Sequence, residues 1–260
     1  MISGHASSEG TKKFAQNSGV NQVNFNKFQN LTLSNVGVGT YLGEPDSITD
    51  TKVTNAVKQS ITSGVNVIDS AINYRSQKAE RSVGKAISEL ITDGKISRDQ
   101  IFLSSKNGYV TNDADVQLGF WEYVKQEYTE KGIVSEGDIT SGYHCMTTSY
   151  LSDQLDRSLK NLDVECIDLM YLHNAVEGQI KDVSREQFLE NLKSVFELYE
   201  QKRDEGKIQF YGMATWECFR VASDNTQYLS LEETVNLAQK IGGDNHGFRF
   251  IQLPFNMNYD

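Results

Sequence analysis

The sequence contains few of the residues and patterns that mark specialised classes of protein. Its 260 residues include two prolines, four histidines and three cysteines. The cysteines form no Cys-x-x-Cys pair, and an odd number of widely spaced cysteines favours free thiols in a reducing compartment. We therefore expect a cytoplasmic protein.

Several other patterns are also missing. The chain has no run of about 18 apolar residues, so we expect no membrane span, and its first residues lack the apolar core of a signal peptide. The histidines show no His-x-His or His-Glu-x-x-His spacing, so we expect no metal site. Neither a Gly-x-Gly-x-x-Gly nor a P-loop pattern occurs, so a bound nucleotide would use neither of these turns.

The charge and composition exclude further classes. The net charge is −10, which argues against a nucleic-acid partner, because such partners are bound by neutralising phosphates. The content of 38% hydrophobic and 23% charged residues is typical of a globular protein. The length suits one large domain or two small ones, and single α/β barrels have about 250 residues.

The chain begins with residues 1–22, which are rich in Ser, Gly, Asn and Lys and show no periodicity. We expect a flexible tail there and a single folded domain over residues 23–260. The domain opens with a predicted hairpin around Gln29-Asn30. Short apolar strands then alternate with stretches of helical period, and the predicted strands are 36–39, 67–69, 101–106, 167–173, 209–215 and 250–255.

The alternation of strands and helices predicts parallel βαβ units. Two of the helices begin with capping boxes, at Ser184 and Ser230. By itself, the alternation fits a doubly wound sheet and a barrel equally well. One segment, residues 107–147, interrupts the rhythm, and a connection of this length is usually functional or mobile. We expect its aromatic residues Phe120, Trp121 and Tyr123 to form part of a substrate wall or a lid, with a peripheral decoration as the equal alternative.

Polar residues follow the predicted strands where these end. Asp69, Lys106 and His173 close the second, third and fourth strands, and Tyr74 lies in the loop after Asp69. Each residue alone has an ordinary structural interpretation, as a turn cap or a packed side chain. In a parallel barrel, however, these strand ends form one face, where active sites lie.

Together these four residues suggest acid catalysis by a tyrosine. A phenol with a pKa near 10 donates its proton slowly at neutral pH. An ammonium group about 4 Å away would favour the phenolate by up to about 4 kcal/mol at an effective dielectric constant near 20. Asp69 would hold Lys106, and His173 would orient a carbonyl group. A polarised carbonyl awaits hydride, which requires a nicotinamide or flavin.

The segments around these residues resemble the aldo-keto reductase family. The likeness runs from about Asn30 to Asp260 and is carried by residues 64–71 (GVNVIDSA), Tyr74, 80–84 (ERSVG), 101–106 (IFLSSK), 155–159 (LDRSL), 167–173 (IDLMYLH), 206–212 (GKIQFYG) and 252–256 (QLPFN). The resemblance implies a (β/α)8 TIM barrel, here with about six of the eight βα units, and NADPH-dependent reduction of aldehydes or ketones.

The resemblance also implies roles for individual residues. The catalytic residues would be Tyr74, Lys106, Asp69 and His173, and the cofactor would contact Asp69, Gly39, Thr40, Thr215 and Gln252. Two departures from the family pattern stand out. Ala214-Thr215 occupies the place of a Ser-Asn pair that grips the carboxamide, and the family's seventh and eighth strands, with the phosphate site, have no counterpart before Asp260.

Three functional hypotheses remain open from the sequence. The first is an active reductase of a small-molecule carbonyl substrate. The second is a catalytically impaired fragment, or a non-catalytic subunit that binds a nucleotide or a regulatory partner. The third, a metal-dependent TIM-barrel hydrolase, lacks clustered histidine ligands.

The predicted strand count leads to a first testable prediction. Six strands leave two sheet edges open where eight would close a barrel. The edges would be the strands 36–39 and 250–255, and the second of these carries no charge. We therefore expect the isolated 260-residue chain to be poorly soluble or to self-associate, and to bind NADPH weakly or not at all. Size-exclusion chromatography with cofactor titration measures both, and a stable monomer that binds NADPH at micromolar levels would contradict the prediction.

Overall fold

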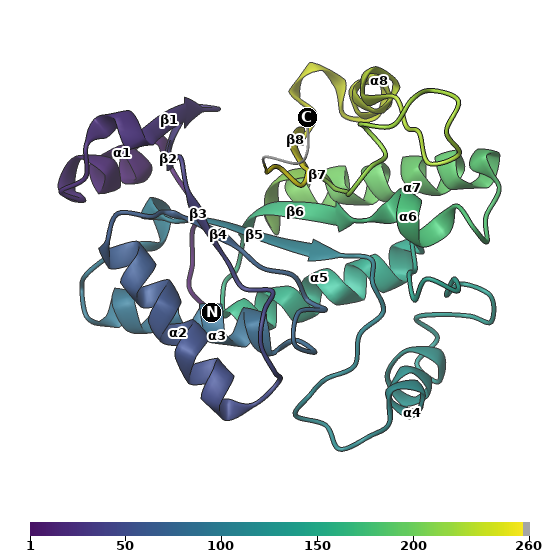
Figure 1. Ribbon diagram of the computed structural model, residues 1–260, viewed down its shortest axis with the longest axis horizontal. Coiled ribbons are helices and arrows are strands. Elements are labelled where there is room, and N and C mark those ends of the chain that lie inside the picture. The colour runs from purple at the N-terminus through teal and green to yellow at the C-terminus, as the bar shows by residue number, and fades with distance from the viewer. Residues whose placement is uncertain (257–260) are drawn as a thin grey trace. The chain divides into compact units, whose positions relative to one another are not determined.

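The computed structural model describes residues 1–256, which fall into two compact units (Figure 1). Unit 1 comprises Met1–Ser105, Asn112–Gln117 and Asp156–Leu169. Unit 2 comprises Lys106–Thr111, Leu118–Leu155 and Met170–Asp260. The boundary passes through two strands, so each of these strands contributes its first residues to unit 1 and its last residues to unit 2.

The strands are those that the apolar runs predict. A hairpin of β1 (Phe25–Phe28) and β2 (Leu31–Ser34) turns through Gln29 and Asn30, as expected. The other strands form a six-stranded sheet in the order β3-β4-β5-β6-β7-β8. Their bounds are Gly37–Gly39 (β3), Val67–Asp69 (β4), Phe102–Asn107 (β5), Ile167–His173 (β6), Ile208–Ala214 (β7) and Phe248–Gln252 (β8).

The strand order decides between the two architectures that the sequence leaves open. A doubly wound sheet reverses its strand order at a switch point, whereas here every strand is followed in space by the next strand in sequence. The pairs β3–β4, β4–β5 and β7–β8 are parallel. The fold is therefore of the (β/α) TIM-barrel type with six strands, and β3 and β8 are the edges of this sheet.

The helices follow the predicted periodicity. Their bounds are α1 Ser8–Asn17, α2 Ser47–Thr62, α3 Lys78–Thr92, α4 Phe120–Val124, α5 Thr148–Leu162, α6 Ala175–Gln179, α7 Arg185–Asp204 and α8 Leu231–Gly242. Short non-α turns are η1 Gln22–Asn24, η2 Arg98–Gln100, η3 Lys125–Thr129 and η4 Gly243–Asn245. Ser184 and Ser230 accept hydrogen bonds from backbone N–H groups in the first turns of α7 and α8, as the capping boxes predict.

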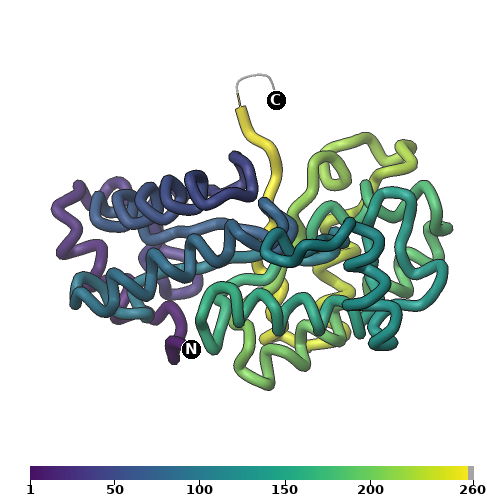
Figure 2. Tube along the Cα trace, turned by 90° about the horizontal axis from the view of Figure 1, so that it is seen from below, coloured from purple at the N-terminus to yellow at the C-terminus, as the bar shows by residue number. Residues whose placement is uncertain are grey.

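Helices α2 and α3 and strand β4 contribute buried apolar side chains to the core of unit 1, and the two helices run side by side in both views (Figures 1 and 2). The predicted apolar face of α3 is fully buried, with Val83, Ile87 and Leu90 at 0% exposure. The face of α2 differs slightly from the prediction, because Thr54 is buried and Ala56 is exposed. Thr54 satisfies its hydroxyl by donating to the backbone oxygen of Ser82 on α3.

The N-terminal residues do not form the flexible tail that their composition suggests. Ser7 caps helix α1, whose Phe14 and Ala15 are buried, and Ile2 forms a parallel bridge with Val164. The low periodicity of this segment concealed the helix, because an amphipathic helix of ten residues with two buried apolar side chains resembles a polar linker in composition.

One buried ion pair joins several segments of unit 1. The Arg98 guanidinium lies 2.8 Å from the Asp168 carboxylate, and both side chains are at most 4% exposed. The same carboxylate accepts hydrogen bonds from the backbone N–H of Ala6 at 2.6 Å and of Leu103 at 2.8 Å. Asp168 thus connects the N-terminal segment, η2, β5 and β6.

Unit 2 is built around a cluster of aromatic side chains. Phe196 and Tyr199 on α7 contact Tyr211 on β7, with ring centroids 5.1 and 5.4 Å apart, and Phe248 on β8 packs on Phe196. The Tyr211 hydroxyl donates to the carboxylate of Glu200. These contacts hold α7 against the pair β7–β8 (Figure 1).

The Arg98–Asp168 pair gives a prediction for stability. Arg98→Met should destabilise the protein by about 3–5 kcal/mol, because removing one partner leaves a buried carboxylate without its counter-charge. The matched control is Lys58→Met, which breaks the Lys58–Glu89 pair, whose side chains are 28% and 41% exposed. An exposed pair contributes about 0–1 kcal/mol. Urea unfolding of both variants measures the free energy of unfolding. Equal losses of this free energy would show that burial does not increase the contribution of the Arg98–Asp168 pair to stability.

Candidate active site

The candidate site residues of unit 1 gather where β3 and β4 end. Asp69 is the last residue of β4 and is in register with Gly39 of β3 and Ser104 of β5. The Ser104 hydroxyl donates to the Asp69 carboxylate at 2.9 Å. Thr40 donates its hydroxyl toward the Asp69 backbone oxygen at 3.2 Å and lies 3.0 Å from the Ser70 hydroxyl. The structure thus brings together three of the predicted residues, Gly39, Thr40 and Asp69.

Tyr74 lies five residues further on, in the connection from β4 to α3. Its ring packs edge-on against Tyr41, with centroids 5.0 Å apart. The three residues that follow Tyr74, Arg75, Ser76 and Gln77, all have left-handed backbone conformations, with φ of 50°, 50° and 75°. Three consecutive left-handed residues other than glycine are unusual, because each costs about 1–2 kcal/mol.

A partly buried ion pair stabilises this left-handed turn, since the Arg75 side chain is 1% exposed and that of Asp50 is 27% exposed. The Arg75 guanidinium is 2.9 Å from the carboxylate of Asp50 on α2 and 2.9 Å from the hydroxyl of Ser82 on α3. It also donates to the backbone oxygen of Lys78. Arg75 therefore anchors the turn next to Tyr74 to both neighbouring helices.

Two of the candidate residues of unit 2, Lys106 and His173, are buried. Lys106 in β5 is 1% exposed and His173, the last residue of β6, is 8% exposed. Burial, followed by the positive charge of Lys106 and by His144, lowers the pKa of His173 to about 3. His173 is therefore a neutral imidazole at physiological pH, able to donate one hydrogen bond without carrying a charge.

Thr215 and Gln252 lie at the ends of β7 and β8 and are joined through the backbone, since the Thr215 N–H donates to the Gln252 oxygen at 3.0 Å. The Thr215 hydroxyl donates to the Glu177 carboxylate at 2.5 Å and accepts from the N–H of Cys218. The same Glu177 oxygen accepts the N–H groups of Trp216 and Glu217. Glu177 was not predicted from the sequence. It lies four residues after the end of β6, and this position near a strand end could have indicated a place close to the site.

The segment 107–147 has a hydrophobic core of its own within unit 2. The buried residues of this core are Val110, Tyr123, Val124, Tyr128, Val134 and Cys145 of the segment, together with Tyr150 of α5. The expectation that Tyr123 faces a substrate is wrong, because this side chain is 2% exposed inside that core. Trp121 and Tyr143 are 55% and 49% exposed and stack on each other, with Phe120 packed edge-on against both.

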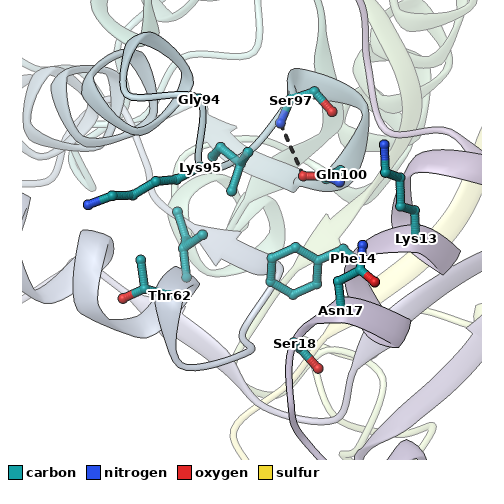
Figure 3. A pocket seen from close by; sticks show the side chains of 11 residues that line it. Lys13, Phe14, Asn17, Ser18, Thr62, Gly94, Lys95, Ser97 and Gln100 are labelled. Carbon is teal, nitrogen blue, oxygen red and sulfur yellow. Dashed lines mark hydrogen bonds between the residues drawn. The ribbon is translucent and has the colours of Figure 1, made fainter.

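A cavity of about 500 Å³ lies elsewhere in unit 1, between α1, the end of α2 and the loop before β5 (Figure 3). Phe14 and Asn17 of α1 line it on one side, and Ser97 and Gln100, joined by a hydrogen bond, line it on the other. Its lining includes none of the expected site residues that the structure describes. It adjoins the strand starts, whereas the candidate residues occupy the strand ends.

Within residues 1–256, no helix is long and apolar enough to cross a membrane. Within the same range, no group of three or more His, Cys, Asp or Glu side chains could hold a metal ion.

The buried histidines give a prediction for pH dependence. Burial lowers the pKa of His144 to about 4 and that of His173 to about 3, whereas both should titrate near 6.5 when unfolded. As pH falls below 6.5 the unfolded state binds more protons, so stability is lost toward pH 4 by up to about 1.4 kcal/mol per pH unit for each histidine.

Urea unfolding at pH 6.5 and pH 5 measures this loss. His144→Gln should reduce the difference between the two pH values, because one depressed pKa is removed. The exposed His5 provides the control, and His5→Gln should leave the difference unchanged. Identical pH dependence in wild type and His144→Gln would contradict the prediction.

Comparison with known proteins identifies the family. The model of the aldo/keto reductase family matches residues 35–231. Human aldo-keto reductase family 1 member C2 is 28% identical over 224 residues, which cover 85% of this chain and 50% of that protein. Prostaglandin-E(2) 9-reductase of Oryctolagus cuniculus is 25% identical over 238 residues, 88% of this chain and 54% of that protein. The chain spans about half the length of these two relatives.

A solved structure of a thermostable aldo-keto reductase, in complex with the inhibitor epalrestat, has a TM-score of 0.56 to this chain at 17% identity. The match covers 89% of this chain and 62% of that one, and it supports the TIM-barrel type of fold. Because the family model extends over three quarters of the sequence, the chain belongs to the aldo/keto reductase family.

Proposed function

We propose that this chain carries the catalytic residues of an NADPH-dependent reductase of aldehydes or ketones. The observation that carries the proposal is the position of Asp69 and His173 as the last residues of their strands, with Lys106 one residue before the end of β5. In TIM-barrel enzymes, catalytic residues come from these strand ends. Membership of the family supports the same interpretation.

In the proposed mechanism Tyr74 is the general acid that protonates the carbonyl oxygen. In the proposed enzyme the positive charge of Lys106 would favour loss of the phenolic proton, and Asp69 would be the charge-assisted hydrogen-bond partner of Lys106. The side chain of Asp69 is itself oriented by the Ser104 hydroxyl. The left-handed turn and the Arg75–Asp50 pair fix the segment that follows Tyr74.

His173 has a separate role in this mechanism. Its low pKa keeps the ring neutral, so it donates a hydrogen bond to the carbonyl oxygen without competing with Tyr74 as an acid. A neutral donor polarises the carbonyl and orients it. In this mechanism Tyr74 transfers the proton and His173 positions the substrate.

The nicotinamide of NADPH supplies the hydride when bound. The proposed contacts are Gly39, Thr40 and Asp69 in unit 1 and Thr215 and Gln252 in unit 2. The Thr215 hydroxyl donates its one proton to Glu177 and accepts from Cys218, so its remaining lone pair can accept from a carboxamide NH2 group. Thr215 and the Gln252 amide are therefore compatible with a carboxamide in that orientation.

The proposal predicts a specific loss in Tyr74→Phe. Without the phenolic proton, kcat for NADPH-dependent reduction of a small aldehyde should fall by about 100-fold or more, since general acid catalysis contributes about 10²–10⁴-fold. NADPH affinity should change little. The measurement is steady-state kinetics together with fluorescence titration of the cofactor, on the longest form of the protein that shows activity.

Tyr41→Phe is the matched control. It removes the hydroxyl of the tyrosine that packs against Tyr74 and should leave turnover close to that of the wild type. Near wild-type turnover in Tyr74→Phe would refute the assignment of the acid. Absence of any NADPH-dependent reduction in the wild-type protein would favour a non-catalytic nucleotide-binding subunit.

A further inference from the structure

A second histidine of unit 2, His144, lies directly against the strand end that carries His173. Its side chain is fully buried, although it belongs to the segment 107–147 and not to a strand of the sheet. Its Nε2 is 2.8 Å from the backbone oxygen of His173. Its Nδ1 is 3.1 Å from the side-chain amide nitrogen of Gln179 on α6.

These neighbours fix one protonation state of His144. The Gln179 side-chain nitrogen also donates to the His144 backbone oxygen at 3.3 Å, which fixes the orientation of the amide group. An amide nitrogen can only donate hydrogen bonds. Nδ1 of His144 therefore accepts a hydrogen bond. A backbone oxygen can only accept a hydrogen bond, so Nε2 carries the proton and donates a hydrogen bond to the backbone oxygen of His173. Burial lowers the pKa of His144 to about 4, which keeps this neutral form at physiological pH.

The backbone of two glycines lies close to the ring. A Cβ placed on Gly108 would lie 2.5 Å from Nε2 of His144, and one placed on Gly178 would lie 2.6 Å from its Cγ. Glycine at these two positions lets the backbone approach both sides of the imidazole. The N–H of Cys145 donates to the Gly108 oxygen at 2.9 Å, and the Thr140 hydroxyl donates to the Gly178 oxygen at 2.6 Å.

Tyr109 completes the arrangement by contacting both histidines. Its ring is edge-on to His144 and to His173, with centroids 5.3 and 5.0 Å apart. The side-chain nitrogen of Asn174, the residue after His173, donates to the Tyr109 hydroxyl at 3.3 Å. The ring of His173 is therefore packed by an aromatic neighbour, and its backbone oxygen is held by a hydrogen bond.

We infer that His144 is a positioning residue that fixes the backbone and ring of His173 for the carbonyl substrate, so that the segment 107–147 acts as a clamp on the catalytic strand end. The inference rests on the proposed function in so far as it concerns catalysis. The N–H of Cys145, the residue after His144, donates to the backbone oxygen of Gly108, which directly follows β5. The same segment therefore contacts the strand ends of both β5 and β6 in unit 2. A neutral donor suits this role, because it directs the His173 oxygen without adding charge beside Lys106.

The test compares His144→Leu with His144→Gln. Leucine removes the donor, whereas the glutamine amide can place an N–H near the position of Nε2. We expect kcat to fall about 10- to 100-fold in His144→Leu with little change in KM or in NADPH affinity, since displacement of a reacting group by about 1 Å can cost 100-fold. His144→Gln should recover most of this loss.

A second measurement does not depend on activity. NMR of ¹⁵N-histidine-labelled protein reports the tautomer of His144 and the titration of His173. We expect Nε2–H on His144 in the wild type. Both variants lose the contribution of His144 that lowers the pKa of His173, so the His173 titration should move toward higher pH in both. It should move further in His144→Leu, where the hydrogen bond to the His173 backbone oxygen is also lost. If the wild type shows no reductase activity, the proposed function fails, and the NMR result still decides whether His144 positions His173.

Val134→Ala is the control for a general loss of stability, because Val134 belongs to the core of the segment 107–147. It should leave the His173 signals unchanged. Unchanged His173 signals in His144→Leu, or equal changes in Val134→Ala, would overturn the inference. If His144→Leu does not fold, His144→Asn replaces it, because the shorter amide cannot reach the His173 backbone oxygen. Equal His173 spectra for the Asn and Gln variants would likewise overturn the inference.

Discussion

The buried ion pair between Arg98 and Asp168 is the interaction on which the rest of unit 1 depends. The Asp168 carboxylate receives donors from the N-terminal segment, from η2 and from β5, while its own backbone belongs to β6. A buried carboxylate is costly unless it is fully paired and hydrogen-bonded, so these segments must be in place together. This requirement explains why a polar N-terminal segment with little hydrophobic surface of its own is ordered.

The strands have different chemistry at their two ends. Near the start of β6, Asp168 is saturated by structural donors and has no room for a ligand. At the other ends lie half-buried Asp69 and Tyr74, buried Lys106 and neutral His173. The structural ion pair thus lies at the opposite strand ends from the proposed catalytic residues. β5 covalently joins the two sets of site residues, since Ser105 closes its part in unit 1 and Lys106 opens its part in unit 2.

Most of the architecture could be predicted, because apolar runs and strand-end polar residues depend on local patterns. β4 and β6 have the predicted bounds, and β8 begins two residues before its prediction. The helix α1 was missed because its burial depends on contacts with distant segments, and the burial of Tyr123 was missed because it depends on how the segment 107–147 folds back on itself. The same holds for His144 and Glu177, whose importance depends on hydrogen bonds to the His173 oxygen and to the turn after β7. The hydrogen-bond partner of a single polar residue cannot be predicted from the sequence when that partner is distant along the chain.

The left-handed turn at residues 75–77 also has a consequence for how this sequence can vary. Three left-handed residues together cost about 3–6 kcal/mol, a large part of the 5–15 kcal/mol by which a typical domain is stable. Glycine would remove this conformational cost at Ser76. At Gln77 it would also remove two side-chain hydrogen bonds, one to the Asn112 backbone oxygen and one from the Asn161 side chain. Arg75 is different, since its side chain holds the turn through Asp50. Random mutagenesis should therefore accept glycine readily at Ser76 while β-branched residues there are rejected, which is the reverse of the pattern inside a strand.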